Sequence, residues 1–423
     1  MRLENRLKEL AKIGKISDTG VCRLAHSIED KQAMDLVSSW MNEAGMTSTI
    51  DSFGNLIGVY EGNDPSLTRL VIGSHIDTQP YAGRFDGTIG VLGAIEVIQL
   101  MQENHIKLER TIEIVSFADE EGARFNKGLF GVRALTGKLE AEEMELKDIN
   151  GTTRAQALKD IELYPNHMEP PRYTPENVCA FLEMHIEQGP LLESQNLPVG
   201  IVSGISGPLW LTVEFEGHSG HAGAVPMGLR QDALVGAARV IHLFDEMVKS
   251  DLSHPTVGTV GFINNFPNSR NTISEKVTFT IDLRDLLPDR RKKYEDQLYQ
   301  LITTTAQMYQ LNYHITEDTN SDPKYCAGWI KEIMQEELTE MGQEPFELMS
   351  GPFHDSLIMA DCCPYGMIFV RCEKGLSHHP NEYADIEDIT IGTQLLYHTV
   401  TRIVNNKHLN VGGNTNESNI QTS

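Results

Sequence analysis

Histidine and acidic residues gather at four places along this chain of 423 residues. The first place is I-G-S-H-I-D-T-Q-P-Y-A-G-R-F-D-G-T-I at 72–89, which contains His75, Asp77 and Asp86 and begins inside a short apolar run. Neutral imidazoles and carboxylates are ligands that divalent cations prefer. The apolar run predicts a buried strand, and open α/β sheets bind ligands at the carboxyl ends of their strands. This segment therefore predicts one part of a metal site.

Three further clusters repeat the pattern. Glu120 and Glu121 follow a second apolar run in A-D-E-E-G, where adjacent acids can divide metal binding and proton transfer between them. Neighbouring side chains on a regular strand point to opposite faces, but a backbone turn after the strand lets both acids face one cavity. The third cluster contains His185 in E-M-H-I-E-Q-G-P, and the fourth contains His378 and His379 in G-L-S-H-H-P-N-E. Four such clusters in one chain predict a two-metal hydrolase.

The spacing within the first cluster suggests separate roles. One residue separates His75 from Asp77, so Asp77 is placed to orient the His75 ring, as metal-bound imidazoles usually require. Asp86 lies in the glycine-bounded turn G-R-F-D-G, where its two carboxylate oxygens can bridge two cations. The competing interpretation is that each histidine is structural and that residues 119–121 form a solvated acidic loop. The joint arrangement favours metal binding over that alternative.

Composition excludes several other classes of protein. The formal charge of −25 argues against a nucleic-acid partner, because phosphate binding requires clustered Lys and Arg. Residues 1–10 predict an amphipathic helix rather than a secretory signal, and no run reaches the ~18 apolar residues of a membrane span. The six cysteines form no C-x-x-C pair, so reduced thiols and a cytoplasmic location are expected.

Hydrophobic periodicity predicts an α/β protein with two domains. Residues 1–208 and 325–408 alternate strand-like and helix-like segments, which predicts a discontinuous metal-binding domain on a mainly parallel sheet. Residues 209–324 predict an inserted α+β sandwich, and the tail at 409–423 is expected to be disordered because it lacks apolar periodicity.

Individual elements are also expected. The insert should follow the order strand, helix, two strands, helix, strand, with strands at 209–216, 256–263 and 276–283 and helices at 232–248 and 290–308. In the larger domain the sequence predicts a tightly packed helix at 90–101, a polar helical excursion at 141–173, a helix at 324–341 and a strand at 367–371.

Five long motifs identify a family resemblance. They are G-S-H-I-D-T-Q-P-Y-A-G-R-F-D-G, F-A-D-E-E-G-A-R-F, E-M-H-I-E-Q-G-P-L-L-E, G-H-A-G-A-V-P-M-G-L-R-Q-D-A and G-L-S-H-H-P-N-E-Y-A, in this order. Together they span about 73–383 and resemble the amidase/hydantoinase/carbamoylase branch of the co-catalytic zinc-peptidase superfamily. That branch contains N-carbamoyl-L-amino-acid hydrolases, β-ureidopropionases and allantoate amidohydrolases.

The resemblance implies a metallopeptidase-like catalytic domain with a binuclear centre. Two divalent ions (Zn²⁺, Mn²⁺, Ni²⁺ or Co²⁺) would be bound by His75, Asp86, Glu121, His185 and His378, with Asp86 as the bridging ligand. The resemblance also makes Asp77 the acid that orients His75, and Glu120 the general base that takes a proton from the attacking water. In the family a non-ligand residue separates the last ligand from the proline, which favours His378 over His379. Chemistry alone does not separate these two neighbours.

The resemblance also implies residues that contact the substrate. His221 in S-G-H-A-G matches a histidine that polarises the scissile carbonyl, whereas the nearby His218 does not precede Ala-Gly. In family dimers this histidine comes from the neighbouring subunit, so the insert would act as a lid and as the interface of a homodimer. Gln188 and Gly351 are further candidates for substrate contact.

Asn271 and Arg284 match positions that bind the substrate carboxylate. A guanidinium suits this task because it binds a carboxylate through two parallel hydrogen bonds and is always charged. Each residue also has a structural alternative, since Asn271 can serve a turn and Arg284 can pair with Asp282 or Asp285.

The expected function is therefore hydrolysis of the ureido C–N bond of N-carbamoyl-L-amino acids, giving the amino acid, CO₂ and ammonia. The substrate would be a small ureido compound that bears a carboxylate. Allantoate amidohydrolase and β-ureidopropionase are alternatives within the branch. His185 argues against a dipeptidase or aminoacylase, because many peptidase relatives have a carboxylate at the corresponding position. The presence of Glu120 argues against a non-catalytic protein.

One segment departs from the family pattern. The family commonly has S-G-A-G-H-D-A, whereas this chain has S-G-P-F-H-D-S at 350–356. Pro352 and Phe353 stiffen and enlarge a loop that borders the substrate in relatives. The departure leaves the metal ligands unchanged and leaves the side chain of the preferred substrate open.

Overall fold

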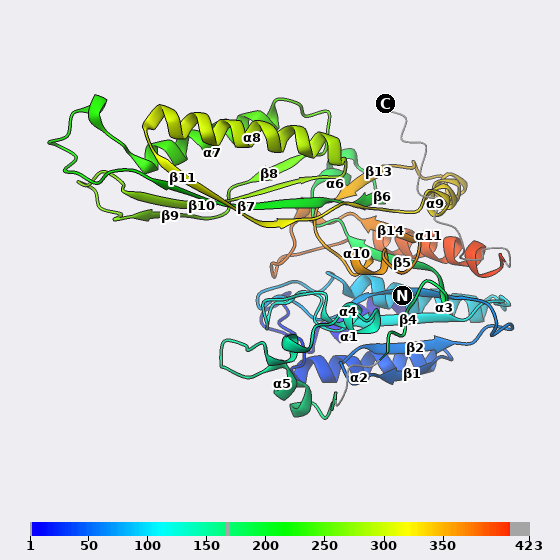
Figure 1. Ribbon diagram of the computed structural model, residues 1–423. Coiled ribbons are helices and arrows are strands. Elements are labelled where there is room, and N and C mark those ends of the chain that lie inside the picture. Colours follow the sequence, from blue (N-terminus) through cyan, green and yellow to red (C-terminus); the bar gives the residue numbers. More distant parts are fainter. Residues whose placement is uncertain (1, 166–169, 407–423) are drawn as a thin grey trace. The chain divides into compact units, whose positions relative to one another are not determined.

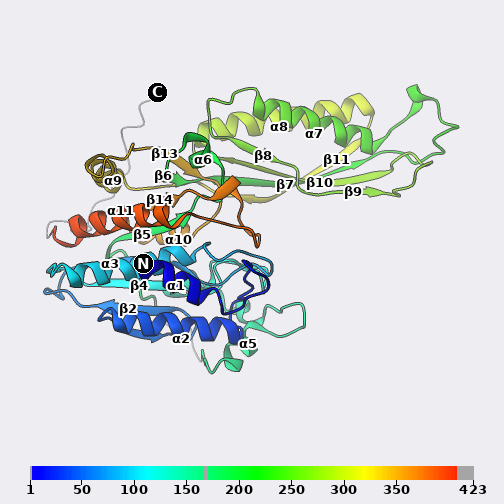
Figure 2. The same cartoon turned by 180° about the vertical axis from the view of Figure 1, so that it is seen from behind.

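The computed structural model describes residues 2–165 and 170–406, which form two compact units (Figure 1, Figure 2). The larger unit comprises Met1–Ser203, Cys326–Leu348 and Phe353–Ser423, and the smaller unit comprises Gly204–Tyr325 and Met349–Pro352. The tail at 409–423, for which the sequence predicts disorder, lies outside the described residues.

A mixed sheet organises the larger unit. Its strand order is β1-β2-β4-β3-β5-β14-β6-β12, and β13 pairs with β6 off this path. The adjacent strands β4, β3, β5 and β14 are parallel, whereas the flanking pairs are antiparallel, so the expected parallel arrangement holds for the four central strands. The strands are β1 (Thr47–Ile50), β2 (Leu56–Tyr60), β3 (Arg69–His75), β4 (Ile112–Phe117), β5 (Val178–Ile186), β6 (Val199–Ile205), β12 (Lys324–Tyr325), β13 (Glu347–Ser350) and β14 (Tyr365–Val370).

Helices cover both faces of the central strands, which explains why their sequences are almost continuously apolar. Met184 of β5 lies in the main apolar core together with residues of α3 (Thr88–Glu103) and α11 (Ile386–Val404). The preceding residue, Glu183, accepts hydrogen bonds from the main-chain N–H (3.0 Å) and the hydroxyl (2.7 Å) of Ser356 in α10 (Ser356–Met359). Since successive side chains of a strand point to opposite faces, α3 and α11 lie on one face and α10 lies on the other. His185 consequently points to the α10 face.

The remaining elements of the larger unit are short or peripheral. The expected helix at 90–101 lies within α3, and the described part of the polar excursion at 141–173 contains the short helices η1 and α5. The expected helix at 324–341 begins only at Gly328, because the two residues of β12 precede it. These elements are α1 (Arg2–Leu10), α2 (Ile28–Glu43), α4 (Phe130–Leu135), η1 (Ala141–Glu145), α5 (Arg154–Asp160), α6 (Leu191–Gln195), α9 (Gly328–Glu340) and η3 (Glu373–Gly375).

The smaller unit is an antiparallel sheet with two helices on one face. Its strand order is β11-β7-β10-β8, and β9 also pairs with β10. Helices α7 and α8 lie side by side against this sheet (Figure 1), and burial alternates along β7 and β10, which leaves the second face more exposed. The elements are β7 (Gly207–Glu216), η2 (Met227–Leu229), α7 (Ala233–Lys249), β8 (Val257–Thr259), β9 (Ile263–Phe266), β10 (Lys276–Asp285), α8 (Pro288–Tyr309) and β11 (Asn312–Asn320).

One predicted strand is interrupted. The sequence predicts a single strand at 256–263, but β8 ends at Thr259 and β9 begins at Ile263. Both strands pair with β10, where Thr259 lies opposite Asp282 and Ile263 lies opposite Phe279. The two paired positions are therefore one residue further apart along β8 and β9 than along β10. This is the pattern of a bulge.

Two simpler predictions concern cysteines and membrane spans. All six cysteines are free thiols, including the vicinal pair Cys362 and Cys363. Across 2–165 and 170–406, no helix combines the length and the apolar character needed to cross a membrane.

Candidate metal centre

The carboxyl ends of the four central strands bring the predicted ligands together. β3 ends at His75 and leads into the turn that carries Asp86, and β4 leads into the turn that carries Glu121. β5 contains His185 close to its end, and β14 leads into the segment that carries His378. Because the four strands are parallel neighbours, their ends meet at one edge of the sheet.

The five predicted ligands form two groups that share Asp86. In the first group, Oδ1 of Asp86 lies 3.0 Å from Nε2 of His185 and 3.5 Å from Nε2 of His75. In the second group, Oδ2 of Asp86 lies 3.4 Å from Nε2 of His378, and that Nε2 lies 3.5 Å from Oε2 of Glu121. Asp86 therefore presents one oxygen to each group, which is the arrangement that a bridging carboxylate needs.

The donor atoms fit two divalent cations. Each group combines imidazole nitrogens with carboxylate oxygens, which suit Zn²⁺ and other first-row metal ions. Oε1 of Glu121 is also buried without a hydrogen-bond partner. A buried acceptor without a donor is unfavourable, and a cation at this position would remove that cost.

Two main-chain carbonyls fix the histidine rings. Nδ1 of His75 donates a hydrogen bond to the main-chain oxygen of Asp77 (3.0 Å), and Nδ1 of His185 donates to the main-chain oxygen of Ile186 (2.9 Å). In the neutral imidazole, a proton on Nδ1 leaves the lone pair on Nε2. Both rings therefore direct a ligand atom toward Asp86.

Asp77 orients the His75 ring through its main-chain oxygen and not, as expected, through its carboxylate. Its Oδ1 lies 3.6 Å from Nδ1 of His75, so the ring contacts the main-chain oxygen of Asp77 more closely than its carboxylate. The carboxylate instead accepts hydrogen bonds from the main-chain N–H groups of Glu120 (3.2 Å) and Glu121 (3.3 Å). Asp77 thus links the first ligand to the turn that carries both acids.

The backbone turns sharply before Glu120, as the sequence predicts for adjacent acids that share one cavity. Asp119 has a φ of 51°, in the left-handed region that non-glycine residues rarely adopt. Its buried carboxylate accepts a hydrogen bond (2.7 Å) from Nη2 of Arg154, which is also buried. This ion pair connects the polar excursion to the turn after β4.

Gly87 allows the bridging residue to approach His75. Gly87 has a φ of 62°, and a Cβ atom there would lie 2.4 Å from Cδ2 and Nε2 of His75. Its N–H donates a hydrogen bond to Nε2 of His185 (3.0 Å). Any larger residue would strain the backbone and displace an imidazole.

Glu120 lies beside the first group. Its Oε2 is 3.6 Å from Nε2 of His75. Burial raises the pKa of Glu120 well above its ordinary value, although His75 acts in the opposite direction. A carboxylate with a raised pKa is suited to accepting and releasing a proton near neutral pH.

Electrostatic coupling shifts the pKa values of the ligands in opposite directions. The hydrogen bond to Asp86 raises the pKa of His378 to about 9. Burial alone would lower the pKa of His75, but Glu120 and Asp86 raise it well above its ordinary value. Burial alone would raise the pKa of Asp86, but His185 and the other two histidines hold it well below its ordinary value. A cation that binds these imidazoles must displace their protons.

Three polar residues that contact the ligands, Gln79, Ser377 and Glu382, carry no signal in the sequence pattern. Nε2 of Gln79 donates a hydrogen bond to Oε2 of Glu121 (2.8 Å). Oγ of Ser377 lies 2.6 Å from Oδ2 of Asp86 and 3.0 Å from Oε2 of Glu382. D-T-Q-P and S-H-H-P-N-E contain these residues, but loop sequences lack the periodicity that would reveal their burial.

Gln188 and His379, which the sequence also offers as candidates, contact different neighbours. Nε2 of Gln188 donates a hydrogen bond to Oδ2 of Asp86 (2.7 Å), so this side chain lies against the bridging carboxylate. The ring of His379 packs edge-to-face on Tyr81, with 5.7 Å between centroids, and its Nδ1 accepts a hydrogen bond from the N–H of Asn381. His378, and not His379, belongs to the second ligand group.

The smaller unit brings His221 and Asn271 together. An isolated bridge pairs His221 with Thr272, and the N–H of Ala222 donates a hydrogen bond to the main-chain oxygen of Asn271 (2.8 Å). His221 and Asn271 are both exposed. Oδ1 of Asn271 also accepts a hydrogen bond from the hydroxyl of Ser269 (3.1 Å), which is the local contact expected of a turn residue.

Arg284 and Gly351 form a second pair in the smaller unit. Nη1 of Arg284 donates a hydrogen bond to the main-chain oxygen of Gly351 (2.7 Å). Nε and Nη2 donate to the carboxylate of Asp282 at 2.8–3.1 Å, and the guanidinium lies 5.8 Å from the centre of the Trp210 ring. The internal ion pair that the sequence offers as an alternative role is therefore present.

The chain is similar to known proteins over most of its length. Residues 71–402 match the model of peptidase family M20/M25/M40. An N-carbamoyl-L-amino-acid amidohydrolase from Pseudomonas sp. (strain NS671) is 44% identical and covers 95% of this chain and 97% of its own, and one from Geobacillus stearothermophilus is 41% identical over 95% and 98%. A crystal structure of an amidase of the hydantoinase/carbamoylase family from Burkholderia multivorans superimposes with a TM-score of 0.88, 34% identity and coverage of 95% and 97%.

Proposed function

The chain belongs to peptidase family M20/M25/M40 and to its amidase, hydantoinase and carbamoylase branch, and from this premise we propose that it is a binuclear metal-dependent amidohydrolase. Its reaction is hydrolysis of the ureido group of N-carbamoyl-L-amino acids, in which R–NH–CO–NH₂ and H₂O give R–NH₂, CO₂ and NH₃. It is a hydrolase of carbon–nitrogen bonds other than peptide bonds, as the names of its two amidohydrolase relatives indicate.

One observation carries the proposal. Two groups of ligand atoms from four strand ends share the carboxylate of Asp86, and Glu120 lies 3.6 Å from a histidine of the first group. This arrangement combines a bridging ligand with an acid that belongs to neither group. A two-metal hydrolase needs both parts.

The side chains have separate tasks in this mechanism. Divalent cations held by the two groups would supply Lewis-acid catalysis, which polarises oxygen atoms and favours deprotonation of water. Glu120 accepts the proton of the attacking water and delivers it to the leaving nitrogen. Asp77 keeps Glu120 in place, because its carboxylate accepts a hydrogen bond from the main-chain N–H of Glu120. His75, Asp86, Glu121, His185 and His378 are the proposed ligands.

The smaller unit supplies most of the proposed substrate contacts. His221 polarises the ureido carbonyl, and Asn271 and Arg284 bind the carboxylate. Gly351 of the same unit and Gln188 of the larger unit are further proposed contacts. The ion pair between Arg284 and Asp282 fixes the plane of the guanidinium, and it is also the structural alternative to carboxylate binding. The segment 209–324 serves as the lid that brings His221, Asn271 and Arg284 to the substrate.

We also propose a homodimer joined through the 209–324 segment. Four apolar side chains on β8, β9 and the residues between them are about half exposed: Val257 (47%), Phe262 (52%), Ile263 (47%) and Phe266 (58%). An edge with exposed apolar side chains is a template for pairing with another strand. The ligand chemistry suits Zn²⁺, Mn²⁺, Ni²⁺ or Co²⁺, and six free thiols support a cytoplasmic location.

Ammonia release tests the function directly. Protein stripped with a chelator and reloaded separately with Zn²⁺, Mn²⁺, Ni²⁺ or Co²⁺ should hydrolyse a panel of N-carbamoyl-L-amino acids. N-carbamoyl-β-alanine and allantoate in the same panel test the alternatives of β-ureidopropionase and allantoate amidohydrolase. An N-acetyl amino acid and a dipeptide complete the panel. Preferential hydrolysis of either would replace the ureido proposal with an aminoacylase or dipeptidase.

A further inference from the structure

Glu382 contacts the main chain of the bridging residue directly and is linked to its carboxylate through Ser377. Oε1 of Glu382 accepts hydrogen bonds from the main-chain N–H groups of Phe85 (2.9 Å) and Asp86 (3.1 Å). Oε2 lies 3.0 Å from Oγ of Ser377, which lies 2.6 Å from Oδ2 of Asp86. Glu382 is only 1% exposed, so these bonds are shielded from water.

We propose that Glu382 is a positioning residue that sets the orientation of the Asp86 carboxylate for cation binding, an inference that rests on the proposed binuclear centre. Two consecutive N–H bonds fix the peptide plane before Asp86, and Ser377 fixes one oxygen of its carboxylate. Asp77 holds the turn of Glu120 and Glu121 through the same kind of contact. Partners of this kind typically change metal affinity or activity by ~10–100-fold when they are removed.

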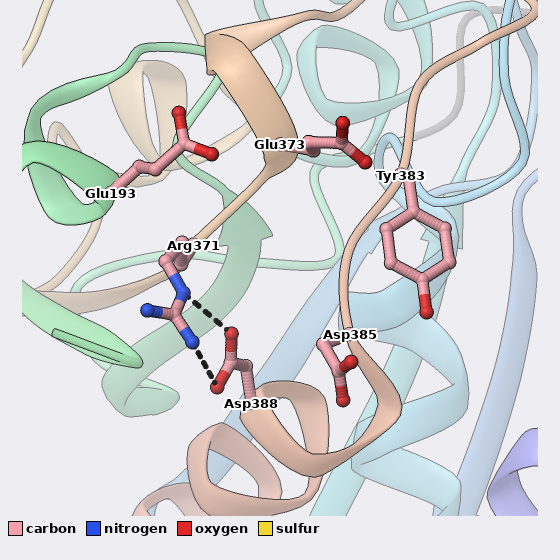
Figure 3. A pocket seen from close by; sticks show the side chains of 6 residues that line it. All are labelled: Glu193, Arg371, Glu373, Tyr383, Asp385 and Asp388. Carbon is pink, nitrogen blue, oxygen red and sulfur yellow. Dashed lines mark hydrogen bonds and ion pairs between the residues drawn. The ribbon is translucent and has the colours of Figure 1, made fainter. Parts of the chain in front are cut away.

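The segment that carries Glu382 is fixed at both ends (Figure 3). Arg371, just after β14, forms a bidentate ion pair with Asp388 at the start of α11, with Nε–Oδ2 of 2.8 Å and Nη2–Oδ1 of 3.1 Å. Across the segment, the N–H of Glu373 donates a hydrogen bond to the main-chain oxygen of Tyr383 (2.8 Å). All four residues border a cavity of about 170 Å³. Glu382 therefore presents its carboxylate from a closed and braced loop.

Aromatic packing joins this loop to the turn that it holds. The ring of Tyr383 packs edge-to-face on Phe85, with 5.9 Å between centroids. Gly83 permits the close approach of Glu382, because a Cβ atom at this position would lie 2.4 Å from Cβ and 2.5 Å from Oε1 of Glu382. Phe85 and Asp86 are thus held by neighbouring residues of one loop, through a ring contact and through hydrogen bonds.

The test compares Glu382→Ala and Glu382→Gln with the unmodified protein. Mn²⁺ titration of chelator-stripped protein by calorimetry should show a dissociation constant ~10–100-fold higher for Glu382→Ala. Glu382→Gln should lose less, because its amide oxygen can still accept the two N–H bonds. At saturating Mn²⁺, KM should stay near that of the unmodified protein, since Glu382 does not touch substrate. Hydrogen exchange of the stripped protein should show faster exchange at Phe85 and Asp86 in Glu382→Ala.

Two further variants make the outcome decisive. Ser377→Ala removes the hydroxyl but no charge, and it should weaken Mn²⁺ binding even if Glu382→Ala does not fold. Glu373→Gln changes an exposed acid of the same loop and should leave Mn²⁺ affinity unchanged. Mn²⁺ affinity and exchange rates equal to those of the unmodified protein in Glu382→Ala, or in Ser377→Ala if the first variant is unfolded, would overturn the inference. Loss of thermal stability without a change in affinity would also overturn it.

The same experiment separates this inference from the proposed function. Weakened Mn²⁺ binding in the Glu382 variants of a protein that hydrolyses no ureido compound would refute the proposed substrate and retain the positioning role. Normal ureido hydrolysis with unaltered Mn²⁺ binding in the variants would refute the positioning role alone. Unmodified protein that binds no divalent ion would refute both.

Discussion

Each acid at the candidate metal centre is held by different partners, and the partners indicate its task. Asp86 faces three histidines and is anchored through its own N–H by Glu382. Glu121 accepts a hydrogen bond from Gln79 and lies 3.5 Å from His378. Glu120 belongs to neither ligand group, although it adjoins Glu121 in sequence. The two neighbouring acids should therefore respond differently to the same substitution.

Glu120→Gln should lower kcat by ~10²–10⁴ and leave the metal content nearly unchanged, because the amide keeps the shape of the side chain but cannot accept a proton. Glu121→Gln is the matched comparison, and it should lose metal from the second group. Elemental analysis and ammonia release measure both effects. Activity above about a tenth of the unmodified level in Glu120→Gln would show that another residue accepts the proton.

Arg284→Ala should raise KM for a carbamoyl amino acid by ~10–150-fold, since loss of a charged hydrogen-bonding partner costs roughly 1.5–3 kcal/mol. Arg284→Lys should restore only part of the affinity, because lysine keeps the charge without the planar fork. The ion pair with Asp282 makes a structural role the competing explanation. Kinetics with the carboxamide derivative distinguish the two, since a structural role predicts equal losses for the acid and the amide.

Metal affinity should increase with pH. The pKa of His378 is raised to about 9 and that of His75 is raised well above its ordinary value, so both rings carry a proton near neutral pH before a cation binds. Each proton that the cation displaces makes the apparent affinity rise by about tenfold per pH unit while that ring is protonated. Calorimetric Mn²⁺ titration in buffers with different ionisation enthalpies counts the released protons. An affinity that does not change between about pH 6 and pH 8 would contradict this account.

At the level of strands and helices, apolar runs were the most informative signal in the sequence. The runs before His75 and Glu120 correspond to β3 and β4, because strands that are buried on both faces are apolar almost throughout. The break between β8 and β9 was not predicted, since a bulge changes pairing without changing composition. The roles of Gln79, Ser377 and Glu382 were not predicted either. Their burial depends on loop contacts between segments far apart in the sequence.

Gly87→Ala tests the turn that joins β3 to α3. The substitution requires alanine to adopt a left-handed backbone conformation, which lowers the free energy of unfolding by roughly 1–2 kcal/mol. It also directs a Cβ atom at the ring of His75. Gly342→Ala is the matched control, because Gly342 has a φ of 73° but no atom within 4 Å of its Cβ position. Both variants should lose thermal stability, measured as Tm without metal, and Gly87→Ala should lose more because of the contact with the His75 ring. Only Gly87→Ala should lose Mn²⁺ affinity, and an equal loss in both would refute the contact argument.

The residues proposed for metal binding and those proposed for substrate contact fall mostly in different units of the chain. The five proposed ligands and Glu120 belong to the larger unit, whereas His221, Asn271, Arg284 and Gly351 belong to the smaller unit. The roles of the residues in the smaller unit are predictions from the family resemblance, because its motifs cover both segments. Neither composition nor periodicity could predict these roles, since they do not relate residues in different domains.

Subunit mixing tests whether His221 acts across a dimer. His221→Ala and Glu120→Gln should each be inactive alone, and a heterodimer should regain one complete site from His221 of one chain and Glu120 of the other. Tagged subunits verify the exchange before activity is measured. Demonstrated heterodimers without activity would show that His221 acts in its own subunit or has no role in the reaction.

The position of β14 has a consequence for synthesis on the ribosome. β14 lies between β5 and β6 in the sheet, although the chain completes β6 at Ile205 and β14 only at Val370. At ~5–20 residues per second, translation leaves a delay of roughly ten to thirty seconds between these strands. During that delay β5 and β6 lack the strand that pairs with both, while the smaller unit has time to fold. Since His378 follows β14, the nascent chain completes its sheet and its second ligand group only after this late segment has been synthesised.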